Sequence, residues 1–335
     1  MSKNIKKRQH VVPQFYLNCF AVQTKPNLFK IYCYFKQYKN KIKRPKVEDV
    51  AVKKFFYDDG TLPQPIENYL SLTERDLSRT YHKVIREWAI NTLNKKEKTN
   101  LVYLTYFQYI RTEYMREKST QLFNDISQKE KLNYLRDHTI EEWDRLNEFS
   151  TTKHPINVQK LLIVIDDDYV RHWSKKVNQS YLNIMKTLLN LKKRIVNTLF
   201  NLNQTLLEIK DDSQEFYTSD HPILFYSKKA VEDDEGMTFL EILDPHTQIY
   251  YPLSPKLCLN FYNSSIFNDY ETKYPNMKRE LYKSDIKEVI LINKLVTHEA
   301  YRMIFSRTGR FNVAQRYLDD NPKFRDLHLR RFLKE

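Results

Sequence analysis

His10 lies in a short segment, Arg8-Gln9-His10-Val11-Val12-Pro13, whose residue types could support acid–base chemistry. The imidazole titrates near neutral pH, so a histidine can take up or release a proton during a reaction. The segment follows several basic residues and leads into a helix that Pro13 is suited to start. A histidine at such a junction more commonly caps a helix or bonds across the chain, so both roles are kept for His10.

A second polar group lies in the helix-like stretch 108–116. At about 100° per residue, Gln108 and Arg111 share one helix face, and Arg116 borders it. An arginine in an otherwise apolar helix needs an anionic or carbonyl partner, because burying the charge alone is costly. Anion binding and a structural ion pair, for instance with Asp220, are equally good interpretations of Arg111.

The third group is Thr218-Ser219-Asp220-His221-Pro222, where a strand runs into a proline. Polar side chains at a strand end are a common setting for an active site. The same pattern is also typical of a turn in which Ser219 or Asp220 bonds the nearby backbone. The spacing alone favours the turn.

Several familiar chemistries are excluded by what the sequence lacks. The only glycines are Gly60, Gly236 and Gly309, too far apart for a Walker loop or a dinucleotide-binding fingerprint. The nine histidines form no zinc-binding spacing, and there is no GxSxG motif. The three cysteines form no CxxC pair, which favours a reducing compartment. With no signal peptide and no long apolar run, a cytoplasmic protein with no membrane partner is expected.

The net charge of +14 raises the question of a polyanionic partner such as nucleic acid. Residues 36–54 and the arginine-rich stretch 302–331 are basic, whereas residues 211–235 are acidic, so the surface field is expected to be uneven. A composition rich in lysine, asparagine, isoleucine and tyrosine is also what AT-rich coding produces. Lysine exceeds arginine, although bidentate phosphate recognition favours arginine. Charge therefore supports nucleic-acid binding only modestly.

The elements that must position these residues follow from hydrophobic periodicity. Helices are expected at 13–21, 65–88, 101–123, 128–149, 167–203 and 284–306, with Asn94 and Glu97 forming a capping box before the third. Strands are expected at 28–35, near 55–57, and at 206–209, 215–218, 223–226, 248–251 and 257–261. Strands at both ends of the chain predict a helix-rich α+β domain with a mostly antiparallel sheet built from N-terminal and C-terminal strands. One domain is expected over 1–310, followed by a basic C-terminal extension over 311–335.

The order of these motifs also matches a known pattern. The matching residues are His10, Pro13, Tyr16, Leu17, Phe20, Tyr57, Arg111, Thr112, Arg116, Ser219, Asp220, Pro222, Pro252-Leu253-Ser254-Pro255 and Asn293. In this order they resemble the family catalogued as domain of unknown function 4238, over almost the entire chain. Glu113 stands where the family usually has proline, so the helix is expected to continue straight, and His221 replaces the commoner asparagine.

The resemblance implies a one-domain bacterial protein and brings no established reaction. It does group His10, Arg111, Asp220 and Asn293, which lie in separate elements. We predict a phosphodiester hydrolase acting on RNA or DNA, in the setting of bacterial defence, with Mg²⁺ or Mn²⁺ as the metals to test. His10, Asp220 and Arg111 are its catalytic candidates, and its substrate-binding candidates are Gln108, Arg116, Ser219, His221 and Asn293.

Two alternatives stay open. A non-enzymatic nucleic-acid-binding or sensing module would use the same polar residues as a structural network. Hydrolysis of a small phosphorylated metabolite is the other. The oligomeric state does not follow from the sequence.

Overall fold

The computed structural model describes residues 5–57, 64–117, 196–227, 246–263 and 278–326. Its largest sheet has five strands in the order β12-β7-β11-β10-β9. These strands are β7 (Asn203–Ile209), β9 (Leu224–Ser227), β10 (Thr247–Ser254), β11 (Leu257–Tyr262) and β12 (Lys278–Leu281). All the pairs are antiparallel except β12 with β7, which is parallel. Since β10 and β11 are buried along their whole length, both faces of this sheet are covered.

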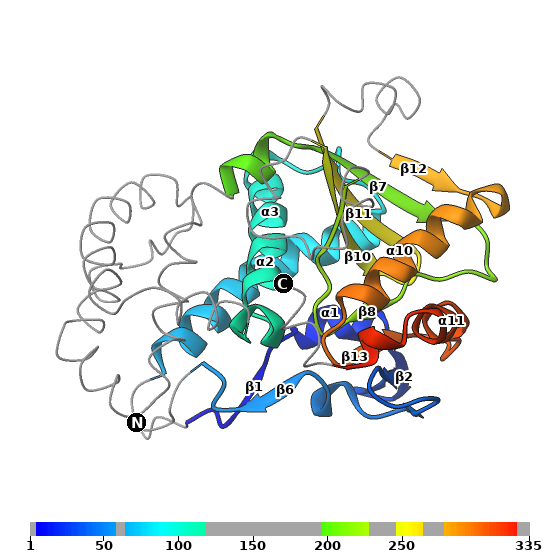
Figure 1. Cartoon of the computed structure of the whole chain (residues 1–335). Helices are drawn as coiled ribbons and strands as arrows, with labels where there is room; N and C mark the ends of the chain where they lie inside the picture. The colour runs from blue at the N-terminus through cyan, green and yellow to red at the C-terminus, as the bar shows by residue number, and fades with distance from the viewer. Residues whose placement is uncertain (1–4, 58–63, 118–195, 228–245, 264–277, 327–335) are drawn as a thin grey trace, which may run out of the picture.

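A second sheet of four strands joins the two halves of the chain in the order β5-β4-β13-β8. Its N-terminal strands are β4 (Tyr32–Phe35) and β5 (Ile42–Lys43), and its C-terminal strands are β8 (Thr218–Ser219) and β13 (Met303–Ser306). Every pairing in it is antiparallel. In Figure 1 the blue N-terminal part of the chain accordingly lies beside the orange and red C-terminal part. The α+β class and the joining of strands from both ends are therefore confirmed.

Two long helices cover one face of the five-stranded sheet. They are α2 (Pro65–Glu87) and α3 (Lys95–Ile110), which pack against each other. The capping box expected at the start of α3 is present, because Asn94 accepts from the backbone N–H of Glu97 and the Glu97 side chain accepts from that of Asn94. Nearly every residue of the second half of α3 is buried, so α3 runs through the larger apolar core.

The opposite face of the sheet carries the C-terminal helices α10 (Ile286–Glu299) and α11 (Asn312–Asp320), which contact each other. Phe311, Ala314 and Leu318 are buried in a second apolar cluster with Val289 and Ile292 of α10. Residues 312–326 of the expected basic extension thus include a packed helix.

The N-terminal segment begins with β1 (Arg8–His10), which pairs with β6 (Val52–Lys54). It continues into α1 (Gln14–Cys19), whose N-cap residue is Pro13, close to the expected bounds. Tyr16 of α1 is fully buried, stacks on Tyr251 of β10, and donates a hydrogen bond of 2.7 Å to the carbonyl of Pro252. This anchor holds the His10 segment against the large sheet.

Two of the expected helices differ from their predicted bounds by six or more residues, and the first of them, α3, begins at Lys95 and not at 101. The helix expected over 101–123 ends at Ile110, and residues 113–117 are helical again, so its straight continuation through Glu113 was wrong. Thr112 causes the break, because its hydroxyl bonds the carbonyl of Tyr109 and also accepts from the backbone N–H of Met115.

The second difference concerns the helix expected over 284–306, which ends at Glu299 and is followed by β13.

The strand expected over 28–35 is divided at Ile31 into β3 (Leu28–Lys30), which pairs with β2 (Val22–Lys25), and β4. The extended segment near 55–57 lies slightly earlier, as β6. The helix expected over 128–149, most of that over 167–203 and the 58–60 turn lie outside the described residues.

Candidate functional site

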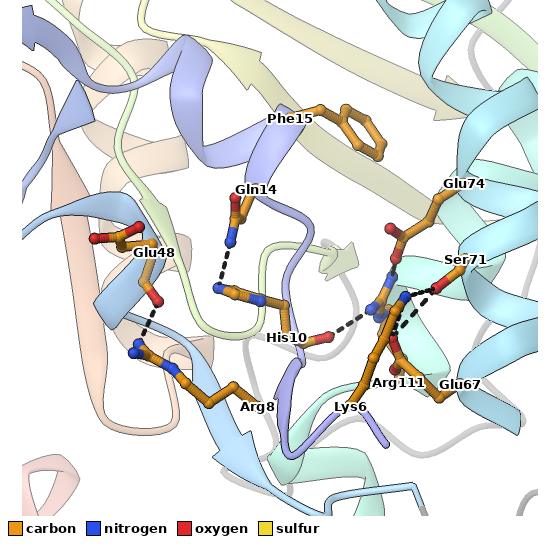
Figure 2. Close-up of a pocket in the computed structure, with 10 residues that line it drawn as sticks. All are labelled: Lys6, Arg8, His10, Gln14, Phe15, Glu48, Glu67, Ser71, Glu74 and Arg111. Carbon is orange, nitrogen blue, oxygen red and sulfur yellow. Dashed lines mark hydrogen bonds and ion pairs between the residues drawn. The ribbon is translucent and has the colours of Figure 1, made fainter. Parts of the chain in front are cut away.

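A cavity of about 490 Å³ opens between the N-terminal segment and α2 (Figure 2). This volume is in the range of pockets that hold small molecules. The residues that line the cavity are Lys6, Arg8, His10, Gln14, Phe15, Glu48, Glu67, Ser71, Glu74 and Arg111. Two of the three expected catalytic residues, His10 and Arg111, therefore face the same space.

His10 is placed in the cavity by the end of β1 and the turn into α1. Its ring nitrogen Nε2 lies 3.1 Å from the amide nitrogen of the exposed Gln14. Burial lowers the pKa of His10, and the positive charge of Arg111 lowers it further, while a hydrogen bond with the backbone of Glu48 acts in the opposite direction. The imidazole is therefore mainly neutral at pH 7, with a basic nitrogen beside the cavity.

Arg111 is buried at the end of α3, where it binds three partners from distant parts of the chain. Its guanidinium donates to the Glu74 carboxylate, to the hydroxyl of Tyr57 at 3.1 Å and to the backbone carbonyl of His10 at 2.5 Å. Burial alone would lower the pKa of Arg111, but the interactions with Glu74 and Tyr57 together outweigh burial and the net shift is upward. Arg111 thus fixes the backbone of His10.

The cavity wall contains as many carboxylates as basic side chains. Lys6 bonds Glu67 at 3.2 Å and Ser71 at 2.7 Å. Arg8 donates to the backbone carbonyl of Glu48 at 2.7 Å, and the Glu48 side chain pairs with Lys46. Since each wall carboxylate has a basic partner, the cavity is lined by ion-paired polar side chains and is not strongly acidic. The cations at its rim are partly exposed.

Asp220, the third expected catalytic residue, lies outside the cavity lining. Its buried carboxylate accepts the backbone N–H groups of Tyr301, Arg302 and Met303 at 2.8–3.1 Å. Burial raises its pKa to about 6, although these hydrogen bonds act in the opposite direction. Asp220 therefore organises the turn between α10 and β13, and the expected convergence of this carboxylate on His10 is not seen.

The neighbours of Asp220 are also held by contacts within the protein. The hydroxyl of Ser219 donates to the carbonyl of His221 at 2.8 Å and accepts from its backbone N–H, which is the turn that the spacing favoured. The His221 ring bonds the Thr112 hydroxyl at 2.7 Å and packs against Tyr109 and Tyr114. His221 of this motif therefore contacts Thr112, the residue next to Arg111.

The remaining substrate-binding candidates are separate from the cavity lining. Asn293 on α10 accepts from the N–H of Tyr217 at 2.8 Å and donates to the carbonyl of Glu215 at 2.9 Å, so it joins the helix to the chain before β8. Arg116 donates to the carbonyl of Phe56 at 3.1 Å and stacks on its ring. Gln108 is fully buried, and neither of its amide atoms has a hydrogen-bond partner among the described residues.

Seven of the ten cavity residues, including Lys6, Glu67, Ser71 and Glu74, were not singled out in the sequence, although one signal was available for three of them. Glu67, Ser71 and Glu74 occur at spacings of four and three residues, so they form a polar stripe on one face of α2. Lys6 completes the stripe from the other side. Such a stripe looks like an ordinary solvated helix face until the position of the N-terminal segment is known.

No metal centre is evident in the parts of the chain that the structure describes, where no three His, Cys, Asp or Glu side chains form a group suited to an ion. Likewise, none of the helices within the described ranges is long and apolar enough to cross a membrane.

Comparison with known proteins gives one family. No curated protein and no solved structure matches the chain. The family model described as protein of unknown function (DUF4238) matches residues 8–310, which include β1, the cavity residues from Arg8 onward and the Ser219–Asp220 turn. With nine-tenths of its length covered by that model, the chain belongs to the DUF4238 family.

Proposed function

We propose that this protein is a hydrolase of phosphodiester bonds in RNA or DNA, with His10 as its general base. The observation that carries the proposal is the placement of His10 in the wall of the 490 Å³ cavity, where burial and the charge of Arg111 lower its pKa and favour the neutral imidazole. A base whose pKa lies somewhat below the working pH is mostly in its active form and still accepts a proton.

The surroundings of His10 support this role. Gln14 is exposed and its amide bonds Nε2, so an incoming water molecule can take its place. His10 Nε2 would accept a proton of this attacking water as its oxygen bonds to phosphorus. The bond from phosphorus to the leaving oxygen then breaks, and that oxygen takes a proton from solvent. Lys6 and Arg8 at the rim would offset the phosphate charge.

Arg111 acts in this proposal as a positioning residue. It holds the His10 carbonyl and lowers the pKa of the imidazole by its charge. Asp220, Ser219, His221 and Asn293 serve the fold in this proposal, because they lie outside the cavity lining and bond backbone groups and side chains of other elements.

That network also favours a second candidate function, a nucleic-acid-binding or sensing module without turnover. The Asp220 and Asn293 contacts are what the alternative requires, since they make the recurring polar residues structural. Binding without cleavage separates the two candidates.

The test compares His10→Gln with a matched control, His82→Gln. His82 is on α2 outside the cavity lining, and burial lowers its pKa as well. Cleavage of labelled single-stranded RNA and DNA is measured with Mg²⁺, with Mn²⁺ and with a chelator. We expect His10→Gln to reduce the rate by about 100-fold or more, and His82→Gln to leave it unchanged.

The pH profile gives a second reading of the same role. Activity should fall as the pH drops through a pKa below 6.5, because the protonated imidazole cannot accept a proton. If the native protein binds oligonucleotides but cleaves none under any of these conditions, the hydrolase proposal fails and the binding module replaces it.

A further inference from the structure

The charge of this chain is distributed in blocks that the fold brings together. Residues 1–47 contain 12 lysines and arginines and no aspartate or glutamate, and the first acidic residue is Glu48. Residues 300–318 contain four arginines and again no acidic residue. Strand β4 from the first block pairs with β13 from the second, so these two acid-free blocks become neighbours in one sheet.

Two further contacts join the blocks outside the strand pairing. The guanidinium of Arg44 stacks over the ring of Tyr32 at 4.8 Å. Gly309 packs closely against the same ring, because a Cβ added to it would lie 2.8 Å from Tyr32. The φ of Gly309, +79°, also favours glycine. The loop that carries Arg307 and Arg310 and the side chain of Arg44 therefore approach the same ring.

The second contact lies at the turn before β5. The side chain of Gln315 on α11 donates to that of Asn40 at 3.4 Å, so the helix that carries Arg316 contacts the turn that leads to Lys41 and Lys43. We call the resulting group of cations the basic edge, since β5 is the edge strand of its sheet. The basic edge consists of Lys41, Lys43, Arg44, Arg307, Arg310 and Arg316.

None of the six residues of the basic edge forms an ion pair among the described residues, and five of the six are exposed. Asp319, three residues after Arg316 on α11, pairs with Arg325, and Glu48, four residues after Arg44, pairs with Lys46. Glu215 is buried and accepts from the hydroxyls of Ser306 and Thr308. Gathering like charges in this way costs folding free energy that a bound polyanion would recover.

We propose that the basic edge binds a single-stranded nucleic acid and leads it to the His10 cavity, an inference that rests on the proposed hydrolase function. The chain from Arg44 to Glu48 in the cavity wall spans at most about 14 Å, at 3.6 Å per residue, so the two sites adjoin.

Aromatic rings and the choice of cation favour a single strand over other polyanions. Tyr38 is 50 % exposed at the same turn, with Lys41 3.9 Å from its ring centre, and such a ring can stack on an unpaired base. Four of the six cations are arginines, which suit phosphate geometry better than lysines do.

The experiment measures binding of a fluorescent single-stranded oligonucleotide to full-length His10→Gln protein over a range of salt concentrations. Arg44→Glu/Arg310→Glu changes two residues of the basic edge. Lys95→Glu/Lys96→Glu makes the same change of net charge at the exposed start of α3, at the opposite end of that helix from Arg111. Melting curves check that all the variants fold.

We expect the first pair to weaken binding more than tenfold at low salt. It should also reduce the slope of log Kd against log salt by about 1.4, at 0.7 for each lost phosphate contact. The control pair should change binding much less. Tyr38→Leu should weaken binding by about fivefold or more through lost stacking.

Three results would overturn the proposal that the basic edge binds a single strand. They are equal weakening of oligonucleotide binding by the two double substitutions, tighter binding to duplex than to single strand, or binding to anionic phospholipid vesicles and not to oligonucleotides. Hydrolysis of a small phosphodiester, bis(p-nitrophenyl) phosphate, by protein with His10 intact separates this inference from the proposed function. If the Arg44→Glu/Arg310→Glu variant still hydrolyses the small phosphodiester but no longer binds the oligonucleotide, both proposals hold. If the native protein binds the oligonucleotide through the edge but hydrolyses neither substrate, only the hydrolase proposal fails.

Discussion

Single polar residues in this protein differ in whether their hydrogen bonds are complete. Gln108 is fully buried with no partner for its amide among the described residues, whereas buried Asn293 bonds two backbone groups. A buried amide without hydrogen-bond partners lowers the free energy of unfolding, whereas a buried amide with partners raises it.

The contrast predicts opposite effects of two similar substitutions. Gln108→Met should leave the free energy of unfolding unchanged or raise it by about 1–2 kcal/mol, because an unpaired amide is removed at constant volume. Asn293→Leu should lower it by about 2–4 kcal/mol, since two backbone groups lose their partner. Urea unfolding measures both. A clear loss of stability in Gln108→Met would mean that its amide has a partner such as water or a ligand.

Asp220 makes a prediction about pH. Its pKa in the folded protein is about 6, above the ordinary value of 3.8, so the folded state binds more protons than the unfolded state between these pH values. The contribution of protonated Asp220 is therefore complete below pH 3.8 and is lost as the pH rises through 6. The loss amounts to about 3 kcal/mol, from a shift of two pKa units.

The measurement is the difference in unfolding free energy between the native protein and Asp220→Asn from pH 4 to pH 7.5. Asparagine does not titrate and accepts N–H bonds through only one atom, so the variant should be less stable at low pH, and the gap should narrow as the pH rises. Other titrating groups cancel in the difference. A gap that stays constant over this range contradicts the raised pKa.

Among the elements, those defined by local pattern were predicted well. The bounds of α2, the capping box of α3 and the cores of β10 and β11 follow from apolar spacing within each segment. Elements that depend on a distant partner were missed or displaced. Strand β13 was assigned to a helix, because its apolar residues fit either period and the choice is made by Asp220, which captures the N–H groups of residues 301–303.

The candidate site could be predicted only in part for the same reason. His10 and Arg111 were grouped before their contact was known. Anion binding and an ion pair, for instance with Asp220, were both open for Arg111, and its carboxylate partner is Glu74. Nothing in the residues near Glu74 distinguishes it from the other charged residues of α2. Its role arises when α3 places Arg111 against that helix.

The loop after β13 gives a prediction at the scale of an element. Gly309→Ala adds a Cβ 2.8 Å from the Tyr32 ring at a positive φ, so the loop must move or strain. The free energy of unfolding should fall by about 1–3 kcal/mol. Asn40→Gly, at another positive φ of 62°, is the converse control and should cost little or nothing. Equal stability of Gly309→Ala and the native protein in thermal melts would show that the loop does not need glycine.

At the scale of the whole molecule, the N-terminal 57 residues contribute no strand to the largest sheet, yet they are held by contacts with distant parts of the chain. Tyr16 bonds Thr218 and Pro252, and the buried ammonium of Lys36 bonds the carbonyls of His298 and Ala300. The cavity therefore depends on the folding of the complete chain, although the residues that line it come from the first third.

The pairing of β4 with β13 has a consequence for how the protein is made. Their partner residues, such as Tyr34 and Ile304, are separated by most of the chain. At about 5–20 residues per second, the ribosome finishes β4 roughly 15–50 seconds before β13 emerges. During this interval the nascent chain carries His10 on a segment without its final partners. A polypeptide cut short before β13 would lack this pairing, so we expect the cavity to form only after translation has passed residue 306.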